Sequence, residues 1–227
     1  MLIAIPDILD VNALYEIRAL IDDAEWVDGA ITAGHQSTLA KNNNQLPEES
    51  AAAQAAGNIV LEGLGKSPLF FAAALPAKVY PPLFNRYNAG HEFRAHIDNA
   101  VRIQPGSDFR VRTDLSATLF LADPDSYDGG ELVIDGQFGI QRIKLPAGHM
   151  VLYPASSLHH VEPITRGIRI ASFFWIQSMV RNDDHRRSLF ELDSAIQTIA
   201  IDRGHADAAI VQLTGVYHNL LRQWADV

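Results

Sequence analysis

The stretch that decides the fold reads Asn85-Arg86-Tyr87-Asn88-Ala89-Gly90-His91-Glu92-Phe93-Arg94-Ala95-His96-Ile97-Asp98. Its central pair is His96 and Asp98. Residues two apart on a β-strand point to the same side, so this imidazole and this carboxylate are expected to stand together and reach one metal ion. A His-x-Asp triplet alone is common, and a lone pair of this kind is more often a hydrogen-bonded surface pair. The interpretation therefore needs a third donor.

Two adjacent histidines downstream, His159 and His160, are the candidates for that donor. Adjacent strand residues point to opposite sides, so only one of them can face the interior, and the alternation around them does not decide which. Two histidines and one carboxylate on one face of an octahedral ion form the facial triad of non-haem Fe(II) oxygenases. The sequence thus predicts an iron site made by His96, Asp98 and one of these two histidines.

An arginine, Arg169, lies in the otherwise apolar stretch that ends at Trp175. Buried arginine is rare unless it is paired, and no acidic residue stands at a fixed spacing from it. A bound dicarboxylate would supply the partner, because the guanidinium fork matches a carboxylate with two parallel hydrogen bonds. The alternative is a structural pair with an Asp or Glu of the chain. Tyr87 is either a donor to the same ligand or a core aromatic residue, and Asn85 shares its strand face.

Composition and charge exclude several classes of function. A net charge of −9 and a pI near 5.4 over 227 residues argue against a protein that binds nucleic acid or an anionic membrane. The chain has no cysteine, so a metal must be held by nitrogen and oxygen donors. The N-terminal segment lacks the features of a signal peptide, and no apolar run approaches the roughly 20 residues of a membrane span. These features predict a cytoplasmic enzyme.

The hydrophobic pattern predicts an α+β protein in three parts. Residues 1–77 are expected to form an N-terminal helical layer, with helices from Asp10 to about Ala24, from Pro47 to Leu64, and from Ser67 to Leu75. Residues 78–178 show about eight short strands, which suggests a closed or double-sheet body such as a jelly roll. Residues 179–227 are expected to form a C-terminal helical extension, with one helix capped by Asp184 and another over 206–224. The expected strands cover residues 78–87, 92–97, 113–122, 131–134, 137–144, 148–153, 159–164 and 168–177.

Three motifs in combination resemble the prolyl-hydroxylase-like branch of the Fe(II)/2-oxoglutarate-dependent dioxygenases. They are Arg86-Tyr87-x-x-Gly90-x-x-Phe93-x-x-His96-x-Asp98, Asp128-Gly129-Gly130-Glu131-Leu132, and His159-x-Val161-x-Pro163-x-x-x-Gly167-x-Arg169. The segment Ala171-Ser172-Phe173-Phe174-Trp175-Ile176-Gln177-Ser178 is similar to the bacterial PKHD-type hydroxylases in particular. The resemblance covers most of the chain, and it implies a double-stranded β-helix (jelly-roll) core at about 78–178.

The resemblance also implies the chemistry. The histidine before x-Val-x-Pro is the metal ligand in that pattern, which selects His159, and the arginine after Gly-x binds the distal carboxylate of 2-oxoglutarate, which selects Arg169. The expected cofactor is Fe²⁺, the cosubstrates are 2-oxoglutarate and O₂, and L-ascorbate is expected to re-reduce stray Fe(III). The implied reaction couples oxidative decarboxylation of 2-oxoglutarate, to succinate and CO₂, with hydroxylation of a substrate. Related halogenases replace the carboxylate that this chain retains as Asp98.

Other readings stay open at this point. The chain could instead be a non-haem iron oxygenase that needs no oxo acid, or a non-catalytic iron- or oxygen-sensing protein. The substrate is either a small molecule or a protein side chain, and the resemblance suggests a link to iron uptake. Its specificity loops are expected at Gly29 to Gln45 and at Asn99 to Arg112. The apolar face of the last two helices is expected to close a homodimer or to cap the barrel, and the dimer is favoured.

Overall fold

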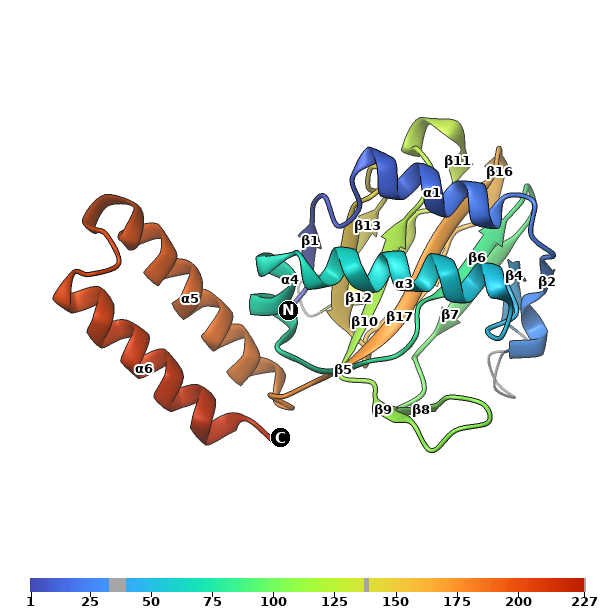
Figure 1. Cartoon of the computed structure of the whole chain (residues 1–227). Helices are drawn as coiled ribbons and strands as arrows, with labels where there is room; N and C mark the ends of the chain where they lie inside the picture. The colour runs from blue at the N-terminus through green and yellow to red at the C-terminus, as the bar shows by residue number, and fades with distance from the viewer. Residues whose placement is uncertain (33–39, 137–138, 227) are drawn as a thin grey trace.

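The computed structural model of the chain describes residues 1–32, 40–136 and 139–226 (Figure 1). Part of the first predicted specificity loop, residues 33–39, and the first two residues of the strand predicted at 137–144 lie outside the described residues. Every pairing among the described strands is antiparallel.

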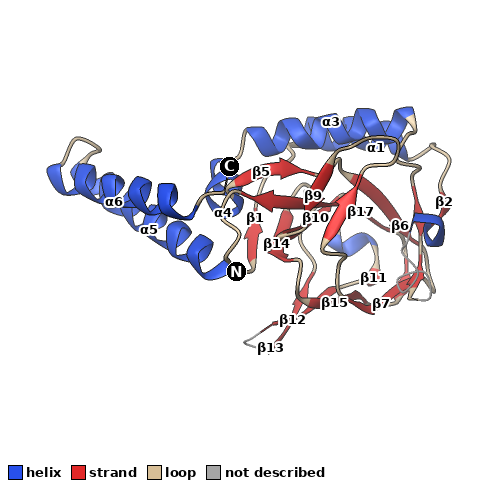
Figure 2. Cartoon of the chain, turned by 90° about the horizontal axis from the view of Figure 1, so that it is seen from below, coloured by secondary structure: helices blue, strands red, loops and turns tan. Residues whose placement is uncertain are grey.

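Two facing antiparallel sheets form the body of the molecule (Figure 2). The major sheet runs in the order β1 (Ile3–Ile5), β14 (Met150–Pro154), β10 (Leu115–Phe120), β17 (Arg169–Ser178), β6 (Leu83–Tyr87), β4 (Asn44–Gln45) and β2 (Val27–Asp28), with β5 (Pro76–Val79) also paired to β17. The minor sheet runs in the order β13 (Gly139–Ile143), β12 (Leu132–Gly136), β15 (Leu158–Val161), β7 (Glu92–His96) and β3 (Lys41–Asn42). Two small ribbons pair β11 (Asp128–Gly129) with β16 (Ile164–Arg166) and β8 (Val101–Ile103) with β9 (Arg110–Arg112). The arrangement is a double-stranded β-helix, so the predicted fold is confirmed.

Two helices, α1 (Val11–Ile21) and α3 (Ala51–Gly65), lie across the outer face of the major sheet (Figure 1). Each buries one apolar face, as the helical spacing predicts: Ile17 and Ile21 from α1, and Val60 and Leu64 from α3. A third helix, predicted from Ser67 to Leu75, is α4 (Pro68–Ala74), and Ser67 is its N-cap. Since α1 and α3 cover the outer face of the major sheet, its inner face remains available to line a site.

Several helices and strands begin or end at residues other than those predicted, because helix caps and prolines set their boundaries. The helix predicted from Pro47 begins instead at Ala51, because the side chain of Ser50 accepts a hydrogen bond from the backbone N–H of Ala53 and caps it there. The helix predicted to be capped by Asp184 is α5 (Asp183–Arg203), and its cap is Asn182. The single strand predicted at 78–87 is two strands, β5 and β6, since prolines 81 and 82 between them lack the backbone N–H that a sheet ladder needs.

Three further features differ from the predictions. Strand β7 ends at His96, so Asp98 follows the strand instead of lying on it. The predicted loop at 99–112 contains the β8–β9 ribbon. Strand β1 pairs with β14 at the edge of the major sheet, although the sequence analysis placed no strand there. Strands β2 and β4 also join the major sheet and β3 joins the minor sheet, so residues 1–77 contribute to the β-body as well as supplying helices.

The C-terminal helices α5 and α6 (Ala208–Trp224) form a hairpin that projects from the β-body (Figures 1 and 2). Arg186 connects the first turn of α5 to the segment that precedes it. It is 1% exposed, and it donates hydrogen bonds to the backbone oxygen of Val180 and to the carboxylate of Asp183. The same carboxylate accepts a hydrogen bond from the N-terminal ammonium group of Met1 at 2.8 Å. Within the described residues, no helix is both long enough and apolar enough to cross a membrane.

Candidate metal centre

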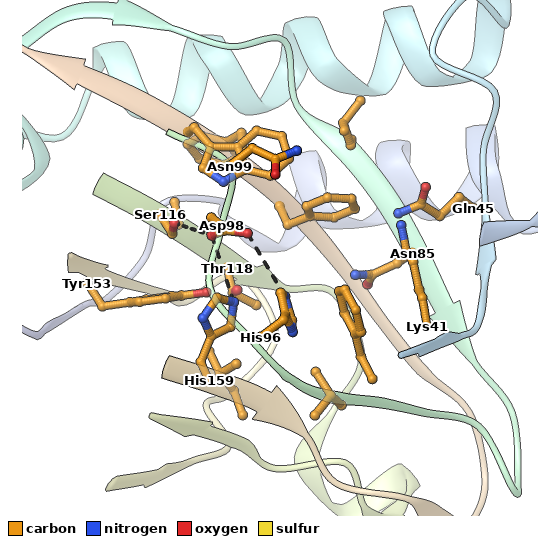
Figure 3. Close-up of a pocket in the computed structure, with 18 of the residues that line it drawn as sticks. Lys41, Gln45, Asn85, His96, Asp98, Asn99, Ser116, Thr118, Tyr153 and His159 are labelled. Carbon is orange, nitrogen blue, oxygen red and sulfur yellow. Dashed lines mark hydrogen bonds and ion pairs between the residues drawn. The ribbon is translucent and has the colours of Figure 1, made fainter. Parts of the chain in front are cut away.

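Antiparallel pairing brings the two predicted histidine ligands together. His96 on β7 and His159 on β15 are register partners across the minor sheet, and their ring centroids lie 4.3 Å apart. One oxygen of Asp98 lies 4.0 Å from Nε2 of His96, and the other lies 3.8 Å from Nε2 of His159. Figure 3 shows the three side chains pointing toward one another. One donor atom from each lies within 4.8 Å of the other two, so a single ion can contact all three.

Hydrogen bonds orient each of the three side chains. Nδ1 of His96 lies 2.8 Å from the backbone oxygen of Arg94, and Nδ1 of His159 lies 3.0 Å from that of Ser157. A carbonyl oxygen can only accept, so each Nδ1 carries the proton and each Nε2 presents a lone pair to the centre. The hydroxyl of Ser116 donates to Oδ2 of Asp98 at 2.6 Å (Figure 3). The donor set of two neutral imidazoles and a carboxylate fits Fe(II).

Burial and the neighbouring His159 together lower the pKa of His96 to about 4. A metal ion needs the unprotonated imidazole, which His96 therefore presents near neutral pH. Both histidine side chains are also well shielded, with 11% of His96 and 6% of His159 exposed.

The other histidine, His160, lies on the opposite face of β15. It is half-buried and pairs in register with Val133, whereas His159 is buried and lines the central cavity. The choice between the two histidines, which the alternation of residues leaves open, follows from this geometry.

The predicted arginine lines the cavity beside the three donors. Arg169 is 1% exposed, and among the described residues its Nε and Nη1 have no hydrogen-bond partner. Its guanidinium carbon lies 5.3 Å from the ring centres of both Tyr87 and Phe120. A buried cation with unsatisfied donors is costly unless a ligand completes it, and a carboxylate has the matching geometry.

Tyr87 combines the two roles that the sequence left open. It belongs to the buried core and also lines the cavity, and its hydroxyl has no hydrogen-bond partner among the described residues. Burial raises the pKa of Tyr87, so the hydroxyl keeps its proton and can donate it to an anionic ligand. Asn85 also lines the cavity, as its strand position predicts.

Two cavity residues, Ser116 and Tyr153, flank the metal ligands and escaped the sequence analysis. Lys41, Asn99 and Arg102 also line the cavity, and they lie within the two predicted specificity loops, Gly29 to Gln45 and Asn99 to Arg112. No spacing signal singles out any of these five residues. A polar residue at an inward position of an otherwise apolar strand, such as Ser116 in β10, is the one sequence feature that could have drawn attention to it.

The fold and the site together define a class: a double-stranded β-helix with a two-histidine, one-carboxylate centre is the architecture of the Fe(II)/2-oxoglutarate-dependent oxygenases. A family model described as the 2OG-Fe(II) oxygenase superfamily matches residues 82–177, and one described as the PKHD-type hydroxylase C-terminal domain matches residues 183–226. Among solved structures, a Pseudomonas putida prolyl-4-hydroxylase is similar over 78% of this chain and 92% of its own, with 19% identity and a TM-score of 0.51. The non-haem α-ketoglutarate-dependent carbocyclase SnoK from nogalamycin biosynthesis is similar over 79% of this chain and 80% of its own, with 15% identity and a TM-score of 0.55.

Relatives with high sequence identity identify the family within this class. A PKHD-type hydroxylase of Rhizorhabdus wittichii is 63% identical, and one of Methylobacillus flagellatus is 59% identical, each with 100% of both chains covered. The chain therefore belongs to the PKHD-type hydroxylase family, within the Fe(II)/2-oxoglutarate-dependent dioxygenases. The predicted family and the predicted class of enzyme are confirmed, and the family implies Fe²⁺ and 2-oxoglutarate.

Proposed function

We propose that this chain hydroxylates its substrate at an Fe(II) ion held by His96, Asp98 and His159, with 2-oxoglutarate anchored by Arg169. The observation that carries the proposal is that Nε and Nη1 of the buried Arg169 have no hydrogen-bond partner among the described residues, in the same cavity as the three metal donors. A purely structural arginine would have its donors paired within the fold, whereas a dicarboxylate in the cavity would supply the partner for these two.

Bound iron and 2-oxoglutarate supply the oxidation, and the chain supplies position and exclusion of water. His96 and His159 are held by their Nδ1 contacts, so that both Nε2 atoms face one point. Arg169 fixes the distal carboxylate, and the hydroxyl of Tyr87, which lines the same cavity, donates to it as well. Apolar side chains, including Leu132, Val161 and Phe174, line the cavity and limit the entry of water.

Finer parts of the assignment stay predictions. They are the use of L-ascorbate, a cytoplasmic location, a link to iron uptake, the divisions at 1–77, 78–178 and 179–227, and a homodimer through the C-terminal helices. The choice between a small-molecule and a protein substrate also stays open at this level.

The test is an anaerobic titration with Fe(II) and 2-oxoglutarate, followed by the weak visible charge-transfer band of the chelate. The wild type is expected to show the band, and His159→Ala is expected to lose it. Arg169→Ala is expected to weaken the band, because its affinity for 2-oxoglutarate falls by at least tenfold. His160→Ala is the matched control and is expected to keep it. Iron binding without a band would contradict the proposal and would favour an oxygenase that needs no oxo acid. A band without any succinate formation in air would favour a sensor.

A further inference from the structure

The cavity that holds the metal donors adjoins a groove on the surface of the molecule. The groove is lined mostly by apolar residues, among them Pro47 and, from β8, Val101 and Ile103. Val101 is 51% exposed and Ile103 is 56% exposed, so an apolar chain that reached the groove would gain contacts there. The wall between this groove and the metal site therefore decides how long a bound molecule can be.

Two residues, Asn99 and Arg102, line both the cavity and the groove. Asn99 directly follows the metal ligand Asp98, and Figure 3 shows the two side chains at the same end of the cavity. A side chain that lines two neighbouring spaces belongs to the wall between them. The boundary between the cavity and the groove therefore lies close to the metal site.

The guanidinium group of Arg102 stands in this boundary. Its central carbon lies 4.6 Å from a ring centre of Trp175, which lines the cavity. Its Nη2 lies 3.6 Å from a carboxylate oxygen of Glu48, which lines the groove. Only 18% of the Arg102 side chain is exposed. The group thus lies between a residue of the cavity and a residue of the groove.

Arg102 is held in this position from several sides. Its guanidinium carbon also lies 5.4 Å from the ring centre of Tyr80, which is fully buried. The hydroxyl of Tyr80 donates a hydrogen bond to the carboxylate of Glu48 at 2.9 Å, so the counter-charge of Arg102 is itself fixed. Stacking on rings and pairing with a carboxylate together hold a guanidinium group in one orientation. Arg102 is therefore a fixed part of the wall.

The position of Arg102 is also far from the residue assigned to 2-oxoglutarate. Arg169 and Trp175 both lie on β17, and roughly 20 Å of extended strand separates them. The part of the cavity beside Arg102 is therefore left to the substrate. Leu83 and Phe173 line the cavity as well, which makes this part apolar.

We propose that the Arg102 side chain is the end wall of the substrate site and sets the length of the substrate group that binds beside the iron. This inference rests on the proposed function, because it concerns the part of the cavity that 2-oxoglutarate leaves free. A group that ends at Arg102 fits within the cavity, whereas a longer one is stopped before it reaches the groove. The substrate that this wall selects presents a compact apolar group.

The test measures how long a chain the site accepts, with straight-chain primary alcohols from butanol to decanol as probes. The full chain is loaded anaerobically with Fe(II) and saturating 2-oxoglutarate. Binding is measured from the paramagnetic broadening of the NMR signals of the probe, with the Zn(II)-loaded protein as the diamagnetic reference, so that only binding near the iron is counted. In the wild type each added methylene group is expected to raise the affinity about three- to fourfold, and the rise is expected to stop before decanol.

Two variants weaken the wall. Arg102→Ala is expected to remove the length limit, so that the affinity still rises at decanol, because the truncated wall joins the cavity to the groove. Glu48→Gln keeps an oxygen that accepts from Tyr80 but removes the counter-charge of Arg102. It is expected to raise the affinity for decanol at least threefold, and it serves as the second variant should Arg102→Ala fail to fold.

Two controls separate this wall from other changes. Arg110→Ala removes an exposed arginine of the same ribbon that is not among the described residues lining either space, and it is expected to keep the wild-type limit. Leu132→Ala removes volume from a buried wall of the cavity away from the groove, and it is expected to move the limit by at most about three methylene groups. A wild-type affinity that rises all the way to decanol, or a limit in Arg102→Ala no longer than that in Leu132→Ala, would overturn the end wall.

Succinate formation from 2-oxoglutarate in air is assayed separately in the same preparations. If succinate forms and Arg102→Ala keeps the wild-type limit, the end wall is wrong and the proposed function stands. If Arg102→Ala removes the limit and no succinate forms, the end wall stands and the proposed function is wrong.

Discussion

Ser116 shows how a residue without a spacing signal can govern a metal site. It is 2% exposed, and its hydroxyl fixes one oxygen of Asp98, which leaves the other oriented toward His96. Groups that orient metal ligands typically contribute 10–100-fold to metal affinity. We expect Ser116→Ala to weaken Fe(II) binding by about tenfold, measured by competition with a chelating dye.

The matched control is Ser172→Ala. Ser172 is also fully buried in the major sheet, but its hydroxyl has no hydrogen-bond partner among the described residues and does not line the cavity. This variant is expected to bind Fe(II) as the wild type does. Equal losses in the two variants would show that Ser116 acts only through packing.

At this scale the sequence predicted the principal donors but not their surroundings. His96, Asp98, His159 and Arg169 have chemistry and spacing that stand out from their neighbours. The choice of His159 over His160 came from the family resemblance, because β15 places an apolar residue, Leu158 (43% exposed), on its outer face and the polar His159 on its inner face, the reverse of the usual apolar-inside pattern. The contacts of Ser116, Lys41 and Arg102 arise between strands that are distant in sequence, and no local pattern encodes them.

Among the elements, the turn before β12 positions the cosubstrate side of the cavity. Gly130 has φ = +70°, and a Cβ there would lie 2.3 Å from Cδ1 of Ile164 and 3.1 Å from both Cδ of Arg169 and Cε2 of Tyr127. An alanine would thus be strained and would also push on the arginine. We expect Gly130→Ala to lower 2-oxoglutarate affinity by roughly tenfold and stability by about 2 kcal/mol or more, measured by charge-transfer titration and urea unfolding.

Gly204→Ala is the control for strain alone. Gly204 has a similar φ of +77°, and a Cβ there would meet no heavy atom within 4 Å. Its variant is expected to lose about 1–3 kcal/mol of stability, because its φ and ψ of 77° and 150° lie in a region that favours glycine, and to lose no 2-oxoglutarate affinity. If Gly130→Ala behaved in the same way, the turn would not position Arg169.

The elements themselves were largely predictable, and the errors have local causes. Apolar periodicity located the helices and most strands, while the caps at Ser50 and Asn182 and the prolines between β5 and β6 set boundaries that periodicity does not register. The β8–β9 ribbon escaped because its apolar residues, Val101 and Ile103, are more than half exposed and give no sign of a buried face.

For the whole molecule, the projecting C-terminal hairpin bears on the predicted homodimer. Ile201 on α5 and Val211 on α6 are 83% and 60% exposed. If this surface closes a dimer, Ile201→Glu and Val211→Glu are expected to convert it to a monomer in light scattering. Val11→Glu is the control, because Val11 is equally exposed but lies on α1 over the β-body. A wild-type monomer at all concentrations would contradict the prediction.

The register of His96 with His159 has a consequence for how the body holds together. An ion bound to both, and to Asp98 beyond the end of β7, would be a cross-link between segments far apart in a chain that has no cysteine for a disulfide. Because the unfolded chain has no preformed site, the free energy of metal binding would stabilise only the folded state, and the ion would be a removable link between strands of the minor sheet. Chelating the metal would then loosen β7 and β15 first, and hydrogen exchange would show the loss in those strands while the helix-backed major sheet stays protected.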